Sequence, residues 1–151
     1  MLQPSPIRYA YLETTNYCNL DCAFCNRRDV VNKQNLMHMS LENWLRCVEI
    51  LRHQPLAQAK LMGLGEPFFH PQFDQIVKVF KRQFPACFTI SATNLQYTID
   101  NKFYDTIKEL DLLYLSIDGY KDTYEAARRG AKWSKLIESL DAIESYLSSQ
   151  R

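Results

Sequence analysis

Apolar and polar positions along the chain repeat one pattern four times, a short β-rich run followed by a longer stretch with apolar residues at helical spacing. The runs predict strands over residues 7–14, 59–65, 87–93 and 112–118. Helices are predicted to begin near Ser40, Pro71 and Thr98, and a fourth one includes the apolar series 133–147. Alternating strands and helices at this spacing predict a parallel sheet with right-handed crossovers, the α/β class.

Each predicted helix has an apolar stripe, which indicates the face that packs on the sheet. The stripe residues are Leu41, Leu45, Val48 and Leu51; then Phe73, Ile76, Val77, Phe80 and Phe84; then Phe103, Ile107 and Leu110; then Trp133, Leu136, Ile137, Leu140, Ile143 and Leu147. Ser40 is the predicted N-cap of the first helix, because serine accepts a hydrogen bond from the helix backbone. Pro71 suits the first position of the second helix.

Composition narrows the class of protein. The chain has 151 residues, of which 46% are hydrophobic and 23% charged, so we expect one soluble globular domain. The net charge of +1 comes from dispersed side chains, which gives no basic stripe for nucleic acid. No apolar run approaches the roughly 20 residues of a membrane span, and no signal-peptide core is present. We therefore expect a cytoplasmic protein without a nucleic acid or membrane partner.

Residues 16–39 form the one long segment without periodicity, and such loops are usually functional. This segment contains Cys18, Cys22 and Cys25, three of the five cysteines in the chain. It follows the first strand, and polar or glycine residues follow the other three, as "GLGEP", "TN" and "DG". Because the carboxyl ends of parallel strands meet at one rim, we expect all four segments to face one cavity.

The three clustered cysteines are consistent with more than one kind of site. A structural zinc ion normally takes four protein ligands, and the fourth would be His38, Cys47 or a more distant residue. The interpretation that the thiols merely pack as small apolar groups is weaker still, because a loop offers little core in which to bury them. A 4Fe-4S cluster usually takes four thiolates, so three would leave one iron open to a cofactor or substrate.

The CxxxCxxC spacing of Cys18, Cys22 and Cys25, with Phe24 before the last cysteine, resembles the signature of the radical S-adenosylmethionine (radical SAM) enzymes. "ETTNYCNLDCAFC" is similar to the peptide-modifying and sulfatase-maturing branch, whose members often carry a SPASM extension. "GLGEPFFHP" resembles the Gly-Glu-Pro motif of the family, "SATN" its third strand, and "LSIDG" with "YEAARRGAKWSKLIESL" its fourth unit. The resemblance covers nearly the whole chain in the same order.

The resemblance implies that Cys18, Cys22 and Cys25 bind a 4Fe-4S cluster whose fourth iron is chelated by S-adenosylmethionine. Reductive cleavage of S-adenosylmethionine would give a 5′-deoxyadenosyl radical that abstracts hydrogen, with a peptide as a candidate substrate and flavodoxin or ferredoxin as electron donor. The residues implied in cofactor binding are Phe24, Gly63, Gly65, Glu66, Pro67, Asn94, Ser116, Asp118 and Arg128.

Individual roles follow from the same resemblance. Gly63, Gly65, Glu66 and Pro67 would line the methionyl end, with the Glu66 carboxylate beside the ammonium group. Ser116 and Asp118 would bind ribose hydroxyls. Arg128 would pair with the methionyl carboxylate, with Arg129 as the competing residue, and both Glu66 and Arg128 are expected at an open rim. Asn94 would contact the cofactor, although Leu95 replaces the glycine that usually follows it.

The chain departs from the resemblance in length, because it shows four strand-helix units where the family barrel has six. We therefore expect residues 1–151 to be an incomplete radical SAM core, a partial TIM-like barrel without strands five and six. A longer chain, a partner chain or a second copy would complete the barrel, since open edge strands are usually covered or paired. The alternatives are a noncatalytic iron-sulfur or electron-transfer module and a zinc-stabilised interaction domain.

Overall fold

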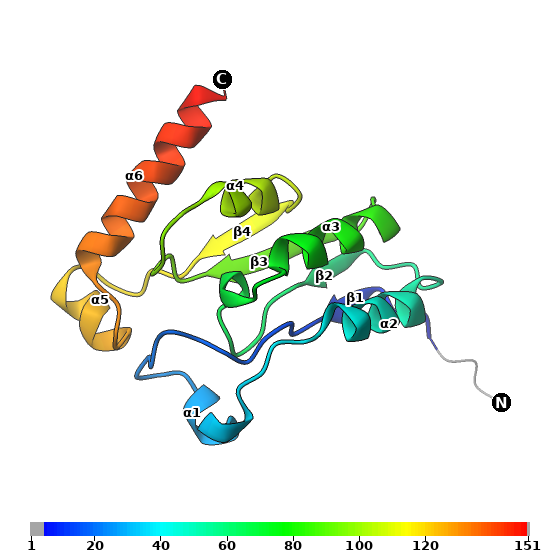
Figure 1. Cartoon of the computed structure of the whole chain (residues 1–151), viewed down its shortest axis with the longest axis horizontal. Coiled ribbons are helices and arrows are strands. Elements are labelled where there is room, and N and C mark those ends of the chain that lie inside the picture. The colour runs from blue at the N-terminus through cyan, green and yellow to red at the C-terminus, as the bar shows by residue number, and fades with distance from the viewer. Residues whose placement is uncertain (1–4, 151) are drawn as a thin grey trace.

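The computed structural model describes residues 5–150, and its centre is one four-stranded parallel sheet (Figure 1). Its strands are β1 (Tyr9–Tyr11), β2 (Gln58–Lys60), β3 (Phe88–Thr93) and β4 (Leu112–Leu115). Their order in the sheet is β1-β2-β3-β4, so every strand pairs with its successor in the chain. A strand order that never reverses is that of a TIM-like barrel, in contrast to doubly wound sheets. The predicted class, α/β units forming part of a TIM-like barrel, is confirmed.

The helices are α1 (Arg27–Val30), α2 (Leu41–Leu51), α3 (Phe73–Gln83), α4 (Asn101–Ile107), α5 (Asp122–Ala127) and α6 (Trp133–Ser149), with 3-10 turns η1 (Lys33–Asn35) and η2 (Pro67–Phe69). Helices α1 to α4 lie in the connections between strands, and α5 and α6 follow the last strand. Helices α2, α3 and α4 lie side by side over one face of the sheet (Figure 1). Helix α6 contacts α4, where the rings of Tyr104 and Tyr146 stack with centroids 3.9 Å apart. No helix of residues 5–150 is both long enough and apolar enough to cross a membrane.

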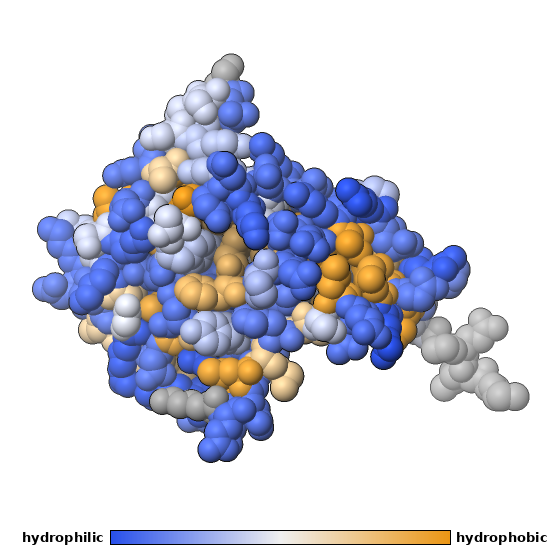
Figure 2. Space-filling view, in the orientation of Figure 1, coloured by the Kyte–Doolittle hydropathy of each residue, from blue (hydrophilic) through white to orange (hydrophobic). Residues whose placement is uncertain are grey.

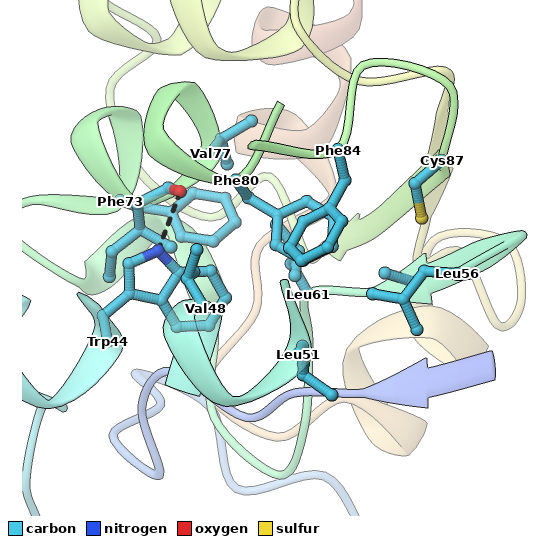
Figure 3. Close-up of a cluster of buried hydrophobic side chains, with 12 residues drawn as sticks. Trp44, Val48, Leu51, Leu56, Leu61, Phe73, Val77, Phe80, Phe84 and Cys87 are labelled. Carbon is cyan, nitrogen blue, oxygen red and sulfur yellow. Dashed lines mark hydrogen bonds between the residues drawn. The ribbon is translucent and has the colours of Figure 1, made fainter. Parts of the chain in front are cut away.

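The main core lies between helices α2 and α3 and the sheet, and it contains the fully buried Trp44 (Figure 3). The indole nitrogen of Trp44 donates a hydrogen bond of 3.1 Å to the backbone oxygen of Ile76, which links α2 to α3. Our assignment of Leu45 to the buried stripe was wrong, because its side chain is 49% exposed. Trp44, Val48 and Leu51 form the buried face instead, since the i, i+4, i+7 series that begins one residue earlier points at the sheet.

Two predicted helix starts shift in the structure. Helix α3 begins at Phe73 rather than Pro71, and the His70 ring accepts a hydrogen bond from the backbone nitrogen of Gln72. Helix α4 begins at Asn101 rather than near Thr98, because the Asp100 carboxylate caps it.

Two other sequence predictions have opposite outcomes. Ser40 does cap α2, accepting from the Asn43 nitrogen at 3.2 Å, as predicted. The stripe of α6 is only partly buried: Leu136 is fully buried, whereas Ile137 and Leu147 are exposed because α6 extends away from the sheet (Figure 1).

Candidate functional site

A pocket of about 170 Å³ opens at the carboxyl ends of the strands. It is lined by Cys18, Leu20, Cys22, Phe24, Cys25, Met62, Gly63, Leu64, Gly65, Glu66, Pro67, Ala92, Thr93, Asn94, Ser116 and Arg128. Every site residue predicted from the sequence is in this lining except Asp118, so the four strand ends do share one cavity. The volume is below the roughly 300–1,000 Å³ of typical small-molecule sites, so these residues enclose part of a binding site.

Five further residues line the pocket that the sequence analysis did not assign individually as site residues, although Leu64 and Thr93 belong to the segments GLGEP and TN that were expected at the cavity. The five are Leu20, Met62, Leu64, Ala92 and Thr93. Four are apolar and none carries an ionisable group, so only their position at a strand end or in the cysteine loop could have indicated them.

The cysteine loop starts and returns at the same place beside β1. An isolated bridge pairs Thr15 with His38, and the Met39 nitrogen donates to the Thr14 oxygen at 2.8 Å. The His38 ring also lies 2.9 Å from the Thr15 hydroxyl, with which it shares a hydrogen bond. The base of the loop is therefore closed by the residues that follow β1, and α1 and η1 lie within the loop.

The tip of the loop is attached to the fourth unit of the chain. Backbone nitrogens of Asp21 and Ala23 donate to the carbonyl oxygens of Arg129 and Ala127 at 2.9 and 2.8 Å. Leu20 is buried in the smaller core cluster, which also contains residues of α5 and α6. Segments more than 100 residues apart thus set the position of the three cysteines together.

All three site cysteines are free thiols that face the same pocket. Burial raises the pKa of the Cys18 thiol, and it also raises the pKa of Cys22, where the guanidinium of Arg128 opposes the effect. Metal binding at these positions therefore has to displace protons.

The geometry of the thiols bears on the kind of metal they suit. Within residues 5–150 no group of three His, Cys, Asp or Glu side chains is arranged around a single ion. In a 4Fe-4S cluster each thiolate binds a different iron, so the sulfurs need not converge on one point. This arrangement of described residues does not provide the ligands of a zinc ion, whereas a 4Fe-4S cluster requires only three soft ligands around one cavity.

The glycine motif after β2 packs on the start of the cysteine loop. A Cβ atom on Gly65 would lie 2.3 Å from the Thr15 oxygen and 2.6 Å from the Tyr17 oxygen, so no side chain fits. A Cβ atom on Gly63 would meet the flexible Glu13 side chain, which can move. Gly65 is therefore required for contact between two backbones, in addition to any approach of a ligand.

Glu66 is buried, with 4% of its surface exposed, which corrects the expectation of an open-rim position. Its carboxylate accepts hydrogen bonds from the backbone nitrogen of Asn94 at 2.8 Å and from the backbone nitrogen of Phe68 at 3.4 Å. Burial raises the pKa of this carboxyl group from 4.5 to about 7. Glu66 thus connects the segment after β2 to the end of β3.

Asn94 contacts the cysteine loop directly. Its side-chain nitrogen donates to the Asn19 side-chain oxygen at 2.8 Å and lies 3.9 Å from the Cys18 sulfur. Leu95, which replaces a glycine of the family pattern, has φ of 57°, in the left-handed region that glycine favours. Its side chain is fully buried, which stabilises a conformation that leucine rarely adopts.

Arg128 lies over the pocket and is 12% exposed, whereas Arg129 is exposed to solvent. Its guanidinium forms an ion pair with Asp118, lies 5.6 Å from the Phe24 ring centroid, and has Nη1 3.9 Å from the Cys22 sulfur. Its Nε is buried without a hydrogen-bond partner. Asp118 contacts Arg128 and does not line the pocket, which differs from the expected ribose contact. Ser116 does line it, and its nitrogen donates to the Thr93 oxygen.

A larger hollow than this pocket lies elsewhere on the described residues. It is an open groove of about 890 Å³ between α2 and α3, over an apolar patch on the helix face (Figure 2). Leu45, Ile50 and Val79 line it together with arginine, glutamate and glutamine side chains of the helix surface. No cysteine, histidine or strand end contributes to this groove, so we place the candidate site at the smaller pocket.

Comparison with known proteins identifies the family. The sequence model of the Radical SAM superfamily matches residues 12–148 of this chain. The chain therefore belongs to the radical SAM superfamily, as the cysteine signature predicted.

Individual relatives are longer than this chain. This chain is 31% identical to the tungsten-containing aldehyde ferredoxin oxidoreductase cofactor-modifying protein of Pyrococcus furiosus. The aligned region of 116 residues covers 74% of this chain and 31% of that protein. This chain is 24% identical over 131 residues to the antilisterial bacteriocin subtilosin biosynthesis protein AlbA of Bacillus subtilis, covering 87% and 28%. The chain thus spans about a third of the length of these relatives.

Solved structures show the same fold. The structure of anSMEcpe with bound AdoMet matches with a TM-score of 0.71 and 20% identity, over 94% of this chain and 41% of that one. SuiB of Streptococcus suis bound to the precursor peptide SuiA matches with a TM-score of 0.70 and 18% identity, over 89% and 29%.

Proposed function

We propose that this chain is the core of a radical SAM enzyme that binds a 4Fe-4S cluster through Cys18, Cys22 and Cys25 and binds S-adenosylmethionine beside it. The observation that carries the proposal is the single pocket in which three free thiols meet the residues that follow all four strands. Three soft ligands suit an iron-sulfur cluster with one open iron. The unpartnered Nε of Arg128 adds a buried donor for an anionic ligand.

A bound, reduced cluster would supply the electron for reductive cleavage of S-adenosylmethionine, which is the chemistry that starts hydrogen abstraction from a substrate. The three cysteines bind as thiolates, so each loses a proton, and the Arg128 guanidinium stabilises the negative charge on Cys22. Apolar side chains of Leu20, Met62 and Ala92 exclude water from the pocket wall.

For the second cofactor, Gly63, Gly65, Glu66 and Pro67 would line its methionyl end, with Glu66 accepting from the ammonium group. Asn94, Ser116 and Arg128 would contact the remainder. Asp118 would act indirectly, because it orients the Arg128 guanidinium rather than facing the pocket. Phe24 would cover the outer side through its contact with Arg128.

The wider proposal concerns the protein in which this core works. Residues 1–151 would be an incomplete core whose open edges at β1 and β4 pair with further strands, from a longer chain, a partner or a second copy. A cytoplasmic location and a flavodoxin or ferredoxin electron donor fit this chemistry. A peptide is the favoured substrate because two similar structures contain one, SuiB with SuiA and anSMEcpe with the Cp18Cys peptide.

The test is anaerobic reconstitution of the chain with iron and sulfide, followed by metal analysis. Reductant and S-adenosylmethionine are then added, and 5′-deoxyadenosine is measured. We expect one 4Fe-4S cluster per chain and 5′-deoxyadenosine at low or uncoupled turnover, because four strands leave one side open to water.

The other outcomes separate the alternatives. A cluster without any 5′-deoxyadenosine would indicate the noncatalytic iron-sulfur or electron-transfer module. Zinc in place of iron would indicate an interaction domain. Light scattering on the same sample tests whether the open edges cause self-association.

A further inference from the structure

The sheet has a second face, opposite the helices, which we call the concave face. Residues alternate between the two faces of a strand. Ala10, Leu12, Ala59 and Leu61 pack in the core beneath the helices. The alternate residues therefore point to the concave face, and the strand register places them in rows: Tyr9 beside Gln58 and Phe88, then Tyr11 beside Lys60, Ile90 and Leu112.

This face contains a cavity of about 280 Å³ lined by Tyr9, Tyr11, Gln58 and Lys60, together with Ala10. The two tyrosines lie on the edge strand β1, and their side chains are 72% and 59% exposed. Lys60 is half-buried on the neighbouring strand β2, opposite Tyr11, and forms no ion pair with any of residues 5–150. The carboxylate of Glu13, two residues beyond Tyr11, accepts from the Leu64 nitrogen instead.

The cavity lies next to the cysteine pocket. Met62 follows Lys60 by two residues and lines the cysteine pocket. A strand rises roughly 3.3 Å per residue, so the two backbone positions are about 7 Å apart. The flexible four-carbon stem of lysine can direct its ammonium group across much of that distance.

We propose that Lys60 is an anion-binding residue of the substrate site and that the substrate of this core carries a carboxylate or phosphate group at that position. The inference rests on the proposed function, because it assigns the concave face below the cysteine pocket to substrate. Lysine is a point charge that binds either anion without a fixed geometry, and the hydroxyls of Tyr9 and Tyr11 add donors. The half-enclosed position strengthens the attraction relative to an exposed lysine.

The experiment uses the reconstituted full chain and three probes, titrated by calorimetry. The probes are inorganic phosphate, N-acetylglutamate amide and the neutral N-acetylglutamine amide. Variants are Lys60→Met, Lys60→Arg and the control Lys102→Met, which removes an exposed cation from α4. Comparing the affinity for phosphate with the affinity for the glutamate probe shows which anion the site selects.

We expect the chain and Lys102→Met to bind an anionic probe equally, Lys60→Met to bind it at least tenfold more weakly, and Lys60→Arg to retain most of the affinity. The glutamine probe should not bind. Equal binding by Lys60→Met, or binding of the glutamine probe as tight as that of the better-bound anionic probe, would overturn the inference. Iron and sulfide are measured on each sample, so a chain that assembles its cluster but lacks Lys60-dependent binding refutes this inference alone. A chain without a cluster refutes the proposed function.

Discussion

The burial of Glu66 makes the stability of the metal-free chain depend on pH, and Glu66→Gln should remove that dependence. The carboxyl pKa rises from 4.5 to about 7 on folding, chiefly because burial disfavours the charged form. Between these values the folded chain retains a proton that the unfolded chain has released. The free energy of unfolding therefore falls as pH rises through this window, and the stabilisation present at low pH is lost above pH 7.

The size of the effect follows from the shift. At 1.36 kcal/mol per pKa unit, the loss approaches ~3 kcal/mol between pH 4.5 and pH 8. Glutamine stays neutral, so the variant does not lose this stability. It gives up the hydrogen bond from Phe68, which costs about 1 kcal/mol. We expect Glu66→Gln to be slightly less stable than the original chain at pH 4.5 and about 2 kcal/mol more stable at pH 8.

The assay is urea unfolding of the reduced, metal-free chain from pH 4.5 to pH 8, followed by the fluorescence of Trp44 and Trp133, which pack in the two core clusters. His38 titrates in the opposite direction, because burial lowers its pKa, but it is present in both proteins and cancels in their difference. The control is Glu13→Gln, which alters an exposed carboxylate that also accepts from a backbone nitrogen. A difference between the original chain and Glu66→Gln that stays constant across pH would refute the reasoning.

Three further predictions concern the cysteine pocket. Cys22→Ala should abolish cluster assembly while Cys47→Ala, which alters a free cysteine of α2, retains it; full iron and sulfide in the first variant would contradict the ligand assignment. Gly65→Ala should destabilise the chain by about 1–3 kcal/mol in urea unfolding, because its Cβ meets backbone oxygens, and more than Gly63→Ala, whose neighbour is a movable side chain; equal losses would count against this packing. Glu66→Gln should weaken binding of S-adenosylmethionine to the reconstituted chain by roughly 1–3 kcal/mol, and an unchanged calorimetric affinity would remove Glu66 from the site.

Several features of this protein follow from local sequence. The four-fold alternation of strand and helix patterns predicts the parallel sheet, and the spacing of Cys18, Cys22 and Cys25 predicts the kind of site. Both predictions use local information, because the strand and helix periods and the spacing of ligands in one loop are visible within short stretches of sequence. The convergence of the strand ends also follows, because parallel strands end at one rim whatever the details of packing.

Other features depend on contacts between distant segments and could be decided only by the tertiary structure. The burial of Glu66 needs the end of β3, and the ion pair of Arg128 with Asp118 needs α5 folded back over the cysteine loop. Whether Trp44 or Leu45 faces the core depends on how α2 is rotated about its axis against α3. The apolar pattern of α2 is compatible with either rotation. No local period records these contacts, since burial and charge pairing arise only when side chains from separate elements exclude water together.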